Sequence, residues 1–554
     1  MNTSKIIIVG GVAGGATAAA RLRRLNEHAE IIMFERGEHI SFANCGLPYY
    51  IGGAIDDREE LLLQTPESFN QRFNVDVRVL SEVISIDCKT KTVTVKNIQT
   101  GKNYSENYDK LVLSPGGSPI KPPIDGIDSK RVFTLRNVAD TDKIKEYIEK
   151  NRPKSAAVVG GGFIGIEMAE NLKDAGLNVS IIELSNQVIA PLDIDIACDI
   201  HKHLRQKGVS LYLNNGVNKI TENKNNNGLI LEMQHGSLET DMLILAIGVK
   251  PESQLAKNAG LKVNERGGIV VDNHMLTSDP DIYAVGDAVE VTDFVTNQAV
   301  MIPLASPANK QARIAADNIC GIKSEYTGTQ GSAVIKAFDM TVAFTGINEK
   351  TAKRLGMNYD KIFLWLPGHA GYYPGSKQMS MKVLFDKENG RILGAQIAGF
   401  DGVDKRCDVL ATAIRAKMTA YDLTRLELCY APPYSSAKDP VNMAGFAIEN
   451  TLSGIVKIFH WHDVDSLPRD GSVILLDVRN PEEVEQGKIN GFINIPLDSL
   501  RERIGELDKS KKVYVHCHSG MRSYIACRIL TQNGFDAYNL SGGYRLYSAV
   551  KNNL

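Results

Sequence analysis

Two glycine-rich turns, at Gly10 and Gly160, constrain this 554-residue chain more than any other feature. In both places a short apolar run leads into the glycines, a helical stretch follows, and a second apolar run ends in glutamate. Such a turn lets backbone N–H groups and a helix N-terminus approach a pyrophosphate, while the carboxylate accepts hydrogen bonds from a ribose hydroxyl. The sequence therefore predicts two βαβ units that each bind a dinucleotide.

The first unit departs from the usual glycine spacing. Gly10, Gly15 and Glu35 stand where the pattern needs them, but Val12 occupies the position of the middle glycine. Taken alone, the segment could also be a glycine-rich turn that binds nothing. Because a second unit of the same kind follows, we predict that both bind.

The second unit carries the complete pattern. Gly160, Gly162 and Gly165 fill all three glycine positions, and Glu183 follows the second apolar run. The carboxylate of Glu183 would repel a 2′-phosphate, and residues 184–186 include no arginine to offset it. We therefore expect this site to prefer NADH to NADPH.

Three further apolar strands break at glycine, as expected where a chain crosses between domains. Ser114 and Gly116 follow one of these strands, Gly248 another, and Gly286 with Asp287 the third. Asp287 alone could be a helix N-cap. In this order the features resemble the two-dinucleotide flavoprotein disulfide reductases, over residues 1 to about 450. The resemblance implies FAD in the first site, a nicotinamide nucleotide in the second, and Asp287 beside the flavin's ribityl-phosphate chain.

The composition excludes several classes of partner. The 63 Lys and Arg nearly cancel the 65 Asp and Glu without any block of like charge, so neither nucleic acid nor an anionic membrane is expected to bind. Eight scattered cysteines without Cys-x-x-Cys spacing argue against a structural metal and a disulfide-stapled secreted fold. Residues 6–20 could be mistaken for a signal peptide, but no apolar run reaches the ~18 residues of a membrane helix. We expect a cytoplasmic protein.

A single cysteine, Cys45, lies just beyond the first unit, in the segment 41–50. With no second thiol nearby, it must store electrons as a mixed disulfide, a sulfenic acid or a persulfide. Asn44 and Pro48 suggest a helix that begins here, whose N-terminus would lower the thiol pKa from about 8.5 to roughly 4–7. The alternative is a buried, inert cysteine.

The segment SFANCGLPYYIGG resembles the surroundings of the redox cysteine in coenzyme A disulfide reductases, which are relatives of NADH peroxidase and NADH oxidase. The resemblance implies a homodimer in which Tyr372 and Tyr430 reach the partner subunit's site, where a phenol can protonate a departing thiolate. Both could instead be ordinary interface aromatics. It also places six residues along the path of coenzyme A: Thr17, Arg24, Ser41, Asn44, Asn309 and Lys438.

The chain changes character after residue 454. A strand at 473–478 runs into a polar turn, and a strand at 513–516 delivers Cys517 into a loop that ends near Arg522. Such a loop can aim backbone N–H groups at one sulfur. The DVRNPEE, NIP and CHSGMRS segments resemble a rhodanese domain, which implies sulfur transfer by Cys517 and Arg522. Cysteine phosphatases use a longer loop, so phosphate hydrolysis is disfavoured, and a catalytically silent module is the other alternative.

We therefore predict an α/β fold with two Rossmann-like domains, an α+β dimerisation domain and a C-terminal α/β rhodanese domain. The predicted bounds are 1–117 with 250–325 for FAD, 118–249 for NAD, 326–453 for dimerisation and 454–554 for rhodanese. The predicted enzyme uses NADH and FAD to reduce coenzyme A disulfide or persulfide. The alternatives are an NADH oxidase or peroxidase with a cysteine sulfenic acid, and a sulfur or redox sensor.

Overall fold

The computed structural model describes residues 4–223 and 228–553. They form two compact units. One unit contains residues 1–184 and 208–331, and the other contains residues 185–207 and 332–554.

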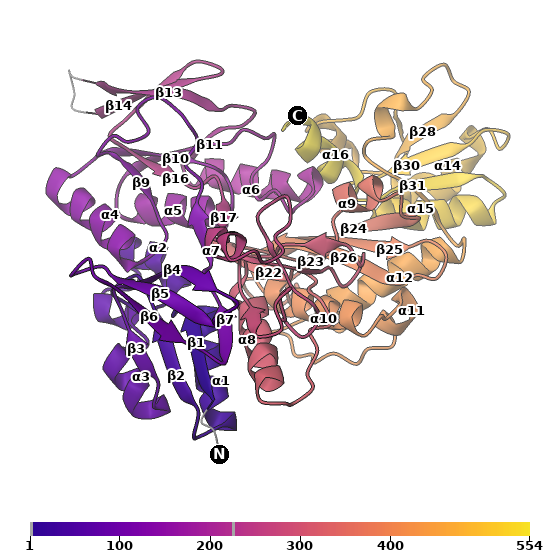
Figure 1. The fold of residues 1–554 in the computed structure, drawn as a ribbon. Coiled ribbons are helices and arrows are strands. Elements are labelled where there is room, and N and C mark those ends of the chain that lie inside the picture. The colour runs from indigo at the N-terminus through magenta and orange to yellow at the C-terminus, as the bar shows by residue number, and fades with distance from the viewer. Residues whose placement is uncertain (1–3, 224–227, 554) are drawn as a thin grey trace. The chain divides into compact units, whose positions relative to one another are not determined.

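The first unit contains the parallel sheet that carries the first glycine turn (Figure 1). Its strands are buried and rich in Ile, Val and Leu, as expected for a parallel sheet covered on both faces. Helix α1 (Ala13–Leu25) follows directly from the turn and packs along α8 (Ala305–Ile319). The strand order is β19 (Ile282–Ala284), β7 (Lys110–Leu113), β1 (Lys5–Val9), β2 (Glu30–Phe34) and β3 (Asp76–Arg78).

A second parallel sheet in the same unit repeats this arrangement. The glycine turn lies between its central strand β10 and helix α5 (Phe163–Asp174), and α4 (Val138–Asn151) leads into β10. Two short strands, β8 (Gly117–Pro119) and β17 (Val249–Pro251), pair where the chain enters and leaves this part. The strand order is β12 (Ser210–Tyr212), β11 (Asn178–Ile182), β10 (Ser155–Val159), β16 (Met242–Leu245) and β9 (Val132–Thr134).

Small elements complete the first unit. Two antiparallel meanders are β4 (Ser81–Asp87), β5 (Thr92–Asn97), β6 (Asn103–Asn107), and β13 (Val217–Asn223), β14 (Gly228–Met233), β15 (Ser237–Thr240). A third small sheet joins β18 (Ile269–Val270), β20 (Val289–Thr292) and β21 (Ala299–Val300). The short helices are α2 (Leu47–Gly52), α3 (Pro66–Phe73) and α7 (Gln254–Asn258).

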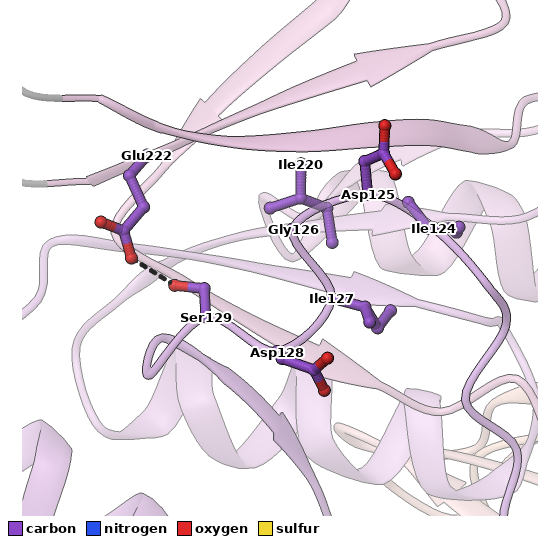
Figure 2. A pocket seen from close by; sticks show the side chains of 8 residues that line it. All are labelled: Ile124, Asp125, Gly126, Ile127, Asp128, Ser129, Ile220 and Glu222. Atoms are coloured by element: carbon purple, nitrogen blue, oxygen red, sulfur yellow. Dashed lines mark hydrogen bonds between the residues drawn. The ribbon is translucent and has the colours of Figure 1, made fainter.

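A cavity of about 450 Å³ opens beside β13 (Figure 2). Isoleucines and three carboxylates line it, and the hydroxyl of Ser129 donates a hydrogen bond of 2.8 Å to Glu222 at its rim. None of the predicted site residues is among its lining residues. We therefore assign it no part in the chemistry below.

The second unit begins with an antiparallel sheet of five strands. Helix α10 (Val403–Arg415) packs on β23 and β26, and α9 (Glu349–Arg354), α11 (Ala420–Leu423) and α12 (Pro440–Leu452) complete this part. Helix α6 (Ile194–Gln206) belongs to this unit although its residues lie inside the predicted NAD domain. The strand order is β22 (Ala333–Ala337), β23 (Met340–Gly346), β26 (Ile392–Gly399), β25 (Gln378–Asp386) and β24 (Tyr359–Pro367).

A parallel five-stranded sheet forms the C-terminal part of the second unit. Its last helix, α16 (Gly543–Lys551), packs on α6, and the backbone N–H of Phe363 donates to the Ser541 hydroxyl at 3.0 Å. This part is therefore packed against the antiparallel sheet. The strand order is β27 (Lys457–Phe459), β31 (Ala537–Leu540), β30 (Val513–His516), β28 (Ile474–Asp477) and β29 (Ile493–Asn494), with helices α13 (Pro481–Glu485), α14 (Leu500–Arg503) and α15 (Met521–Gln532).

Candidate functional site

The first glycine turn has the close packing that a dinucleotide cradle requires. A Cβ atom added at Gly15 would lie 1.8 Å from the Gly10 carbonyl oxygen, so only glycine lets the start of α1 approach the end of β1. The Glu35 carboxylate accepts hydrogen bonds of 2.8 Å from the N–H groups of Gly11 and Gly37. It is thereby held beside the turn, where a ribose would lie. The residues fit the adenosine half of FAD.

The second turn has the same construction. A Cβ atom added at Gly165 would lie 2.0 Å from the Gly160 carbonyl oxygen, whereas one at Gly162 would meet no heavy atom within 4 Å. Gly162 therefore faces open space at the N-terminus of α5, where a pyrophosphate can approach the backbone. The Glu183 carboxylate accepts a hydrogen bond of 2.7 Å from the N–H of Gly161. The residues fit NADH.

The remaining predicted cofactor residues gather at the ends of buried strands. A Cβ atom at Gly10 would lie 2.1 Å from the Ser114 carbonyl oxygen, and Gly116 and Gly248 have φ values of +71° and +113°. Gly286 donates its N–H to the Gln311 side chain at 2.8 Å. The helix N-cap interpretation of Asp287 is wrong, because the strand β20 follows it. Burial raises the pKa of the Asp287 carboxyl.

Cys45 is exposed, and it lies in a 3-10 turn, Asn44–Gly46, directly before α2. The predicted helix start is therefore present, but the predicted fall in the thiol pKa is wrong. Desolvation by surrounding atoms raises the pKa of Cys45, and the carboxylates of Glu167 and Asp287 add to the rise. Desolvation and the two carboxylates together outweigh the dipole of this six-residue helix.

Sequence reasoning missed Glu167, which comes from α5. Burial and the neighbouring Glu170 raise its pKa to about 7, and the Tyr49 hydroxyl donates a hydrogen bond to it. The pKa of Tyr49 is raised to about 12 by burial and by Glu167. A carboxyl group whose pKa is near neutral can exchange a proton with a neighbouring thiol. No local pattern marks it: Glu170 lies three residues away on the same helix, but Tyr49 and Cys45 come from a distant segment.

The predicted substrate residues of the first unit lie along two helices and the loop after β2. The Thr17 hydroxyl donates to the Asn309 side chain at 2.7 Å, and Arg21 pairs with Asp317 at 2.7 Å, so α1 and α8 form a polar seam. Arg24, one turn beyond Arg21, is exposed. Ser41, with φ +45°, donates its N–H to the Gly11 carbonyl, which places it and Asn44 near the first turn.

Arg313 was not predicted, although its spacing gave a signal. It is exposed and lies four residues from both Asn309 and Asp317, on the face of α8 that contacts α1. Together with Arg24 it gives the seam two exposed cations. Two such charges suit a ligand with several phosphate groups.

The two predicted tyrosines form a pair in the second unit. Their hydroxyl oxygens lie 2.8 Å apart, and Tyr372 and Tyr430 are 77% and 47% exposed. Exposed phenols of this kind are suited to contact another surface. Lys438 is exposed in the same unit, eight residues after Tyr430.

One buried arginine holds both tyrosine-bearing segments. Arg406 of α10 donates to the Gly368 carbonyl at 3.0 Å, to the Ser435 hydroxyl at 2.9 Å and to Asp439 at 3.0 Å. The Ala370 N–H donates to the Ser435 carbonyl at 3.0 Å. Arg406 therefore fixes how the two segments lie against each other.

Cys517 lies at the end of β30 and is buried. Its sulfur accepts hydrogen bonds from the Gly520 N–H at 3.1 Å and from the Ser523 hydroxyl at 3.3 Å. These donors suit a negatively charged sulfur, either a thiolate or a persulfide. Arg522 makes a two-pronged ion pair with Glu483, at 2.6 Å for both contacts. Cys527 is buried in α15.

Comparison with known families identifies the first unit. The model of the pyridine nucleotide-disulphide oxidoreductases matches residues 4–312. The chain belongs to this family. The dimerisation domain model of the same oxidoreductases matches residues 332–440, and a rhodanese-like domain model matches residues 461–549. The predicted fold class is thus confirmed.

Relatives of this chain include proteins named as coenzyme A disulfide reductases and as a persulfide reductase. The coenzyme A disulfide reductase of Staphylococcus haemolyticus is 38% identical over 80% of this chain and 98% of its own. The crystal structure of reduced Bacillus anthracis CoADR-RHD is 53% identical, with a TM-score of 0.97, over 99% of this chain and 98% of that one. An NAD-dependent persulfide reductase from A. fulgidus is 37% identical, with a TM-score of 0.90, over 98% and 100%.

Neither a membrane-spanning helix nor a metal-holding group of side chains occurs among the described residues. No helix between residues 4 and 553, leaving aside 224–227, is long and apolar enough to cross a membrane. In the same part of the chain, no three His, Cys, Asp or Glu side chains are grouped so that they could hold a metal ion.

Proposed function

We propose that this protein is an FAD-dependent NADH oxidoreductase that reduces coenzyme A disulfide or coenzyme A persulfide at Cys45. The C-terminal rhodanese domain carries sulfane sulfur on Cys517. The observation that carries the proposal is that Cys45 is exposed and that all eight cysteines are free, so that none forms a disulfide. The bond that is reduced must therefore join Cys45 to a sulfur from outside the chain.

The two sets of glycines and glutamates described above hold FAD and NADH, through Gly10, Gly15 and Glu35 and through Gly162 and Glu183. When bound, FAD supplies the transfer of an electron pair from NADH to sulfur. For the disulfide, NADH and one proton convert one coenzyme A disulfide into two thiols. For the persulfide, the same pair releases one thiol and one hydrogen sulfide.

Cys45 is the residue that exchanges with the substrate. Its thiolate attacks one sulfur of the substrate, a mixed disulfide forms, and the first thiol leaves. Glu167, with a pKa of about 7, can take the proton that Cys45 loses and return it later in the cycle. Cys45 can therefore form its thiolate during the reaction although its pKa is raised, because a proton acceptor is available.

The tyrosine pair provides a second source of protons. We propose that the protein is a homodimer in which Tyr372 and Tyr430 of one subunit reach the Cys45 site of the other. Each phenol can donate a hydrogen bond to the departing thiolate without carrying charge before the reaction. Lys438 lies at the substrate path of the same partner site.

The polar seam between α1 and α8 accounts for the choice of coenzyme A. Its 3′-phospho-ADP end carries several negative charges, which Arg24 and Arg313 can bind, while Thr17 and Asn309 offer polar contacts nearby. Ser41 and Asn44 follow α1 in the sequence and belong to the segment that carries Cys45. We retain the domain bounds given above, and a cytoplasmic setting, which suits free thiols.

Substrate comparison tests the proposal. NADH oxidation is measured with coenzyme A disulfide, coenzyme A persulfide, peroxide and oxygen for the wild type, Cys45→Ser and Cys517→Ser. We expect both sulfur substrates to be turned over by the wild type and neither by Cys45→Ser, while Cys517→Ser still reduces the disulfide. Faster turnover of oxygen or peroxide would favour the oxidase alternative, and no turnover with flavin bound would favour a sensor.

A further inference from the structure

The charges around the rhodanese loop limit which sulfur donors it can accept. His518 follows Cys517 and interacts electrostatically with four ionised groups. These are the guanidinium groups of Arg479, Arg522 and Arg545, and the carboxylate of Glu483. Each of the three guanidinium groups is already paired with a carboxylate. The pairs are Arg522 with Glu483 at 2.6 Å, Arg545 with Asp199 at 2.8 Å and Arg479 with Asp477 at 2.7 Å.

The Arg522 pair lies directly after the cysteine loop, at the start of α15, and the Arg522 side chain is 33% exposed whereas that of Arg479 is 1% exposed. Both terminal nitrogens of its guanidinium are engaged by the two oxygens of Glu483. Arg522 lowers the pKa of the Glu483 carboxyl to about 2, so the carboxylate is charged at neutral pH. The pair is therefore neutral overall.

The donors at the sulfur itself are sufficient for one negative charge. The Gly520 N–H and the Ser523 hydroxyl both point at the Cys517 sulfur, and they can stabilise a thiolate or the terminal sulfur of a persulfide. If the donor brings a second or third negative charge, none of the three arginines near His518 is free to pair with it, because each is already paired with a carboxylate.

Side chains at the loop are in part apolar. Met521 is 44% exposed next to Arg522, and the Trp365 ring contacts the His518 ring with a centroid distance of 5.4 Å. The Arg545 guanidinium lies over the Trp365 ring, 5.1 Å from its centroid. These surfaces suit the carbon chain of an organic persulfide better than a sulfonate group.

We propose that Glu483 is a specificity-determining residue that makes Cys517 accept organic persulfides and reject small dianions such as thiosulfate. The inference rests on the proposed role of Cys517 as a sulfur carrier. In the favoured reaction, the Cys517 thiolate attacks the outer sulfur of RSS⁻, the S–S bond breaks, and RS⁻ leaves and takes up a proton. With thiosulfate, the same attack would release sulfite, and both negative charges would have to lie beside the Glu483 carboxylate.

Glu483→Gln in the full-length protein tests this. Glutamine keeps the size of the side chain and can keep the capping hydrogen bond to the Asn480 N–H, but it leaves Arg522 with an unpaired charge. Glu482→Gln is the matched control, because it removes the same charge from the same helix at an exposed position. Donors are thiosulfate, coenzyme A persulfide and glutathione persulfide, the last two to separate a coenzyme from a general thiol carrier.

Two readouts are compared: the extra sulfur atom on the Cys517 peptide, by mass spectrometry, and thiocyanate formed on addition of cyanide. We expect the wild type to prefer both persulfides, and Glu483→Gln to raise the ratio of kcat/KM for thiosulfate to that for persulfide at least ~10-fold, since one nearby charge changes from compensated to free. Glu482→Gln should leave this ratio unchanged. A ratio that stays constant in Glu483→Gln, or a wild type that prefers thiosulfate, overturns the inference alone. Failure of every donor to load Cys517 overturns the sulfur-carrier role as well.

Discussion

Replacing Arg406 by methionine tests how the tyrosine pair is held. The side chain is 1% exposed and its guanidinium reaches Asp439, the Ser435 hydroxyl and three backbone carbonyls. Methionine fills a similar volume but leaves the Asp439 carboxylate buried without its cation. Breaking a buried ion pair in this way costs about 3–5 kcal/mol.

The contacts that remain place the cost at the lower end of that range. Asp439 keeps the hydrogen bonds from the Ser435 hydroxyl at 2.7 Å and from the Val441 N–H at 2.9 Å, so it is not left entirely unpaired. A cost of about 3 kcal/mol corresponds to a roughly 150-fold larger opening constant, at 1.4 kcal/mol for each factor of ten. Asp439→Asn in addition removes the unpaired charge and should recover part of this loss.

Amide hydrogen exchange measures this opening directly. The N–H of Ala370 and that of Tyr373 are both hydrogen-bonded within the segments that Arg406 holds, so their exchange rates follow local opening. We expect exchange in this peptide to accelerate about 100-fold in Arg406→Met. Arg415→Met, an exposed position on the same helix, should leave it unchanged. Unaltered exchange in Arg406→Met would refute the claim that this arginine positions the tyrosines.

Three further changes give separate tests. Glu167→Gln should move the pH midpoint of iodoacetamide alkylation of Cys45 to lower pH, because the carboxylate raises the pKa of that thiol and its removal eases loss of the proton; an unmoved midpoint contradicts this. Gly15→Ala should yield protein without flavin absorbance, because the added methyl group would lie 1.8 Å from a carbonyl oxygen, and full flavin content would count against the first site. Tyr372→Phe and Tyr430→Phe should each slow disulfide turnover about 100-fold, with the double variant no slower, if the phenols act as one proton source; additive losses would show that they act separately.

The elements that depend on local backbone demands could be predicted from the sequence. Both glycine turns occur at the predicted residues, since only glycine allows β1 to meet α1 and β10 to meet α5 so closely. The strand that ends before Cys517 was predicted from its own consecutive residues and is present as β30. A short apolar run, a turn and a helix each depend on residues that are adjacent in the sequence, so a local pattern is enough to predict them.

Features that depend on distant segments could not be predicted. The pKa of Cys45 is raised and not lowered as predicted, because the fold desolvates the thiol and because the carboxylates of Glu167, on helix α5, and Asp287 add to the rise. Likewise, no local pattern predicts that Arg522 pairs with Glu483, because the two residues are 39 positions apart in the sequence. Arg313 is different, since its spacing from Asn309 on one helix would have allowed the prediction.

The mass of the Cys45 peptide after oxidation tests the central claim most directly. The wild-type protein is incubated with excess coenzyme A disulfide without NADH, unreacted thiols are blocked, and the peptide is analysed without reduction. We predict that Cys45 carries one coenzyme A in a disulfide bond, and that NADH removes it. A disulfide between Cys45 and another cysteine of the chain, or an unmodified Cys45 in protein that still turns over the substrate, would contradict the account.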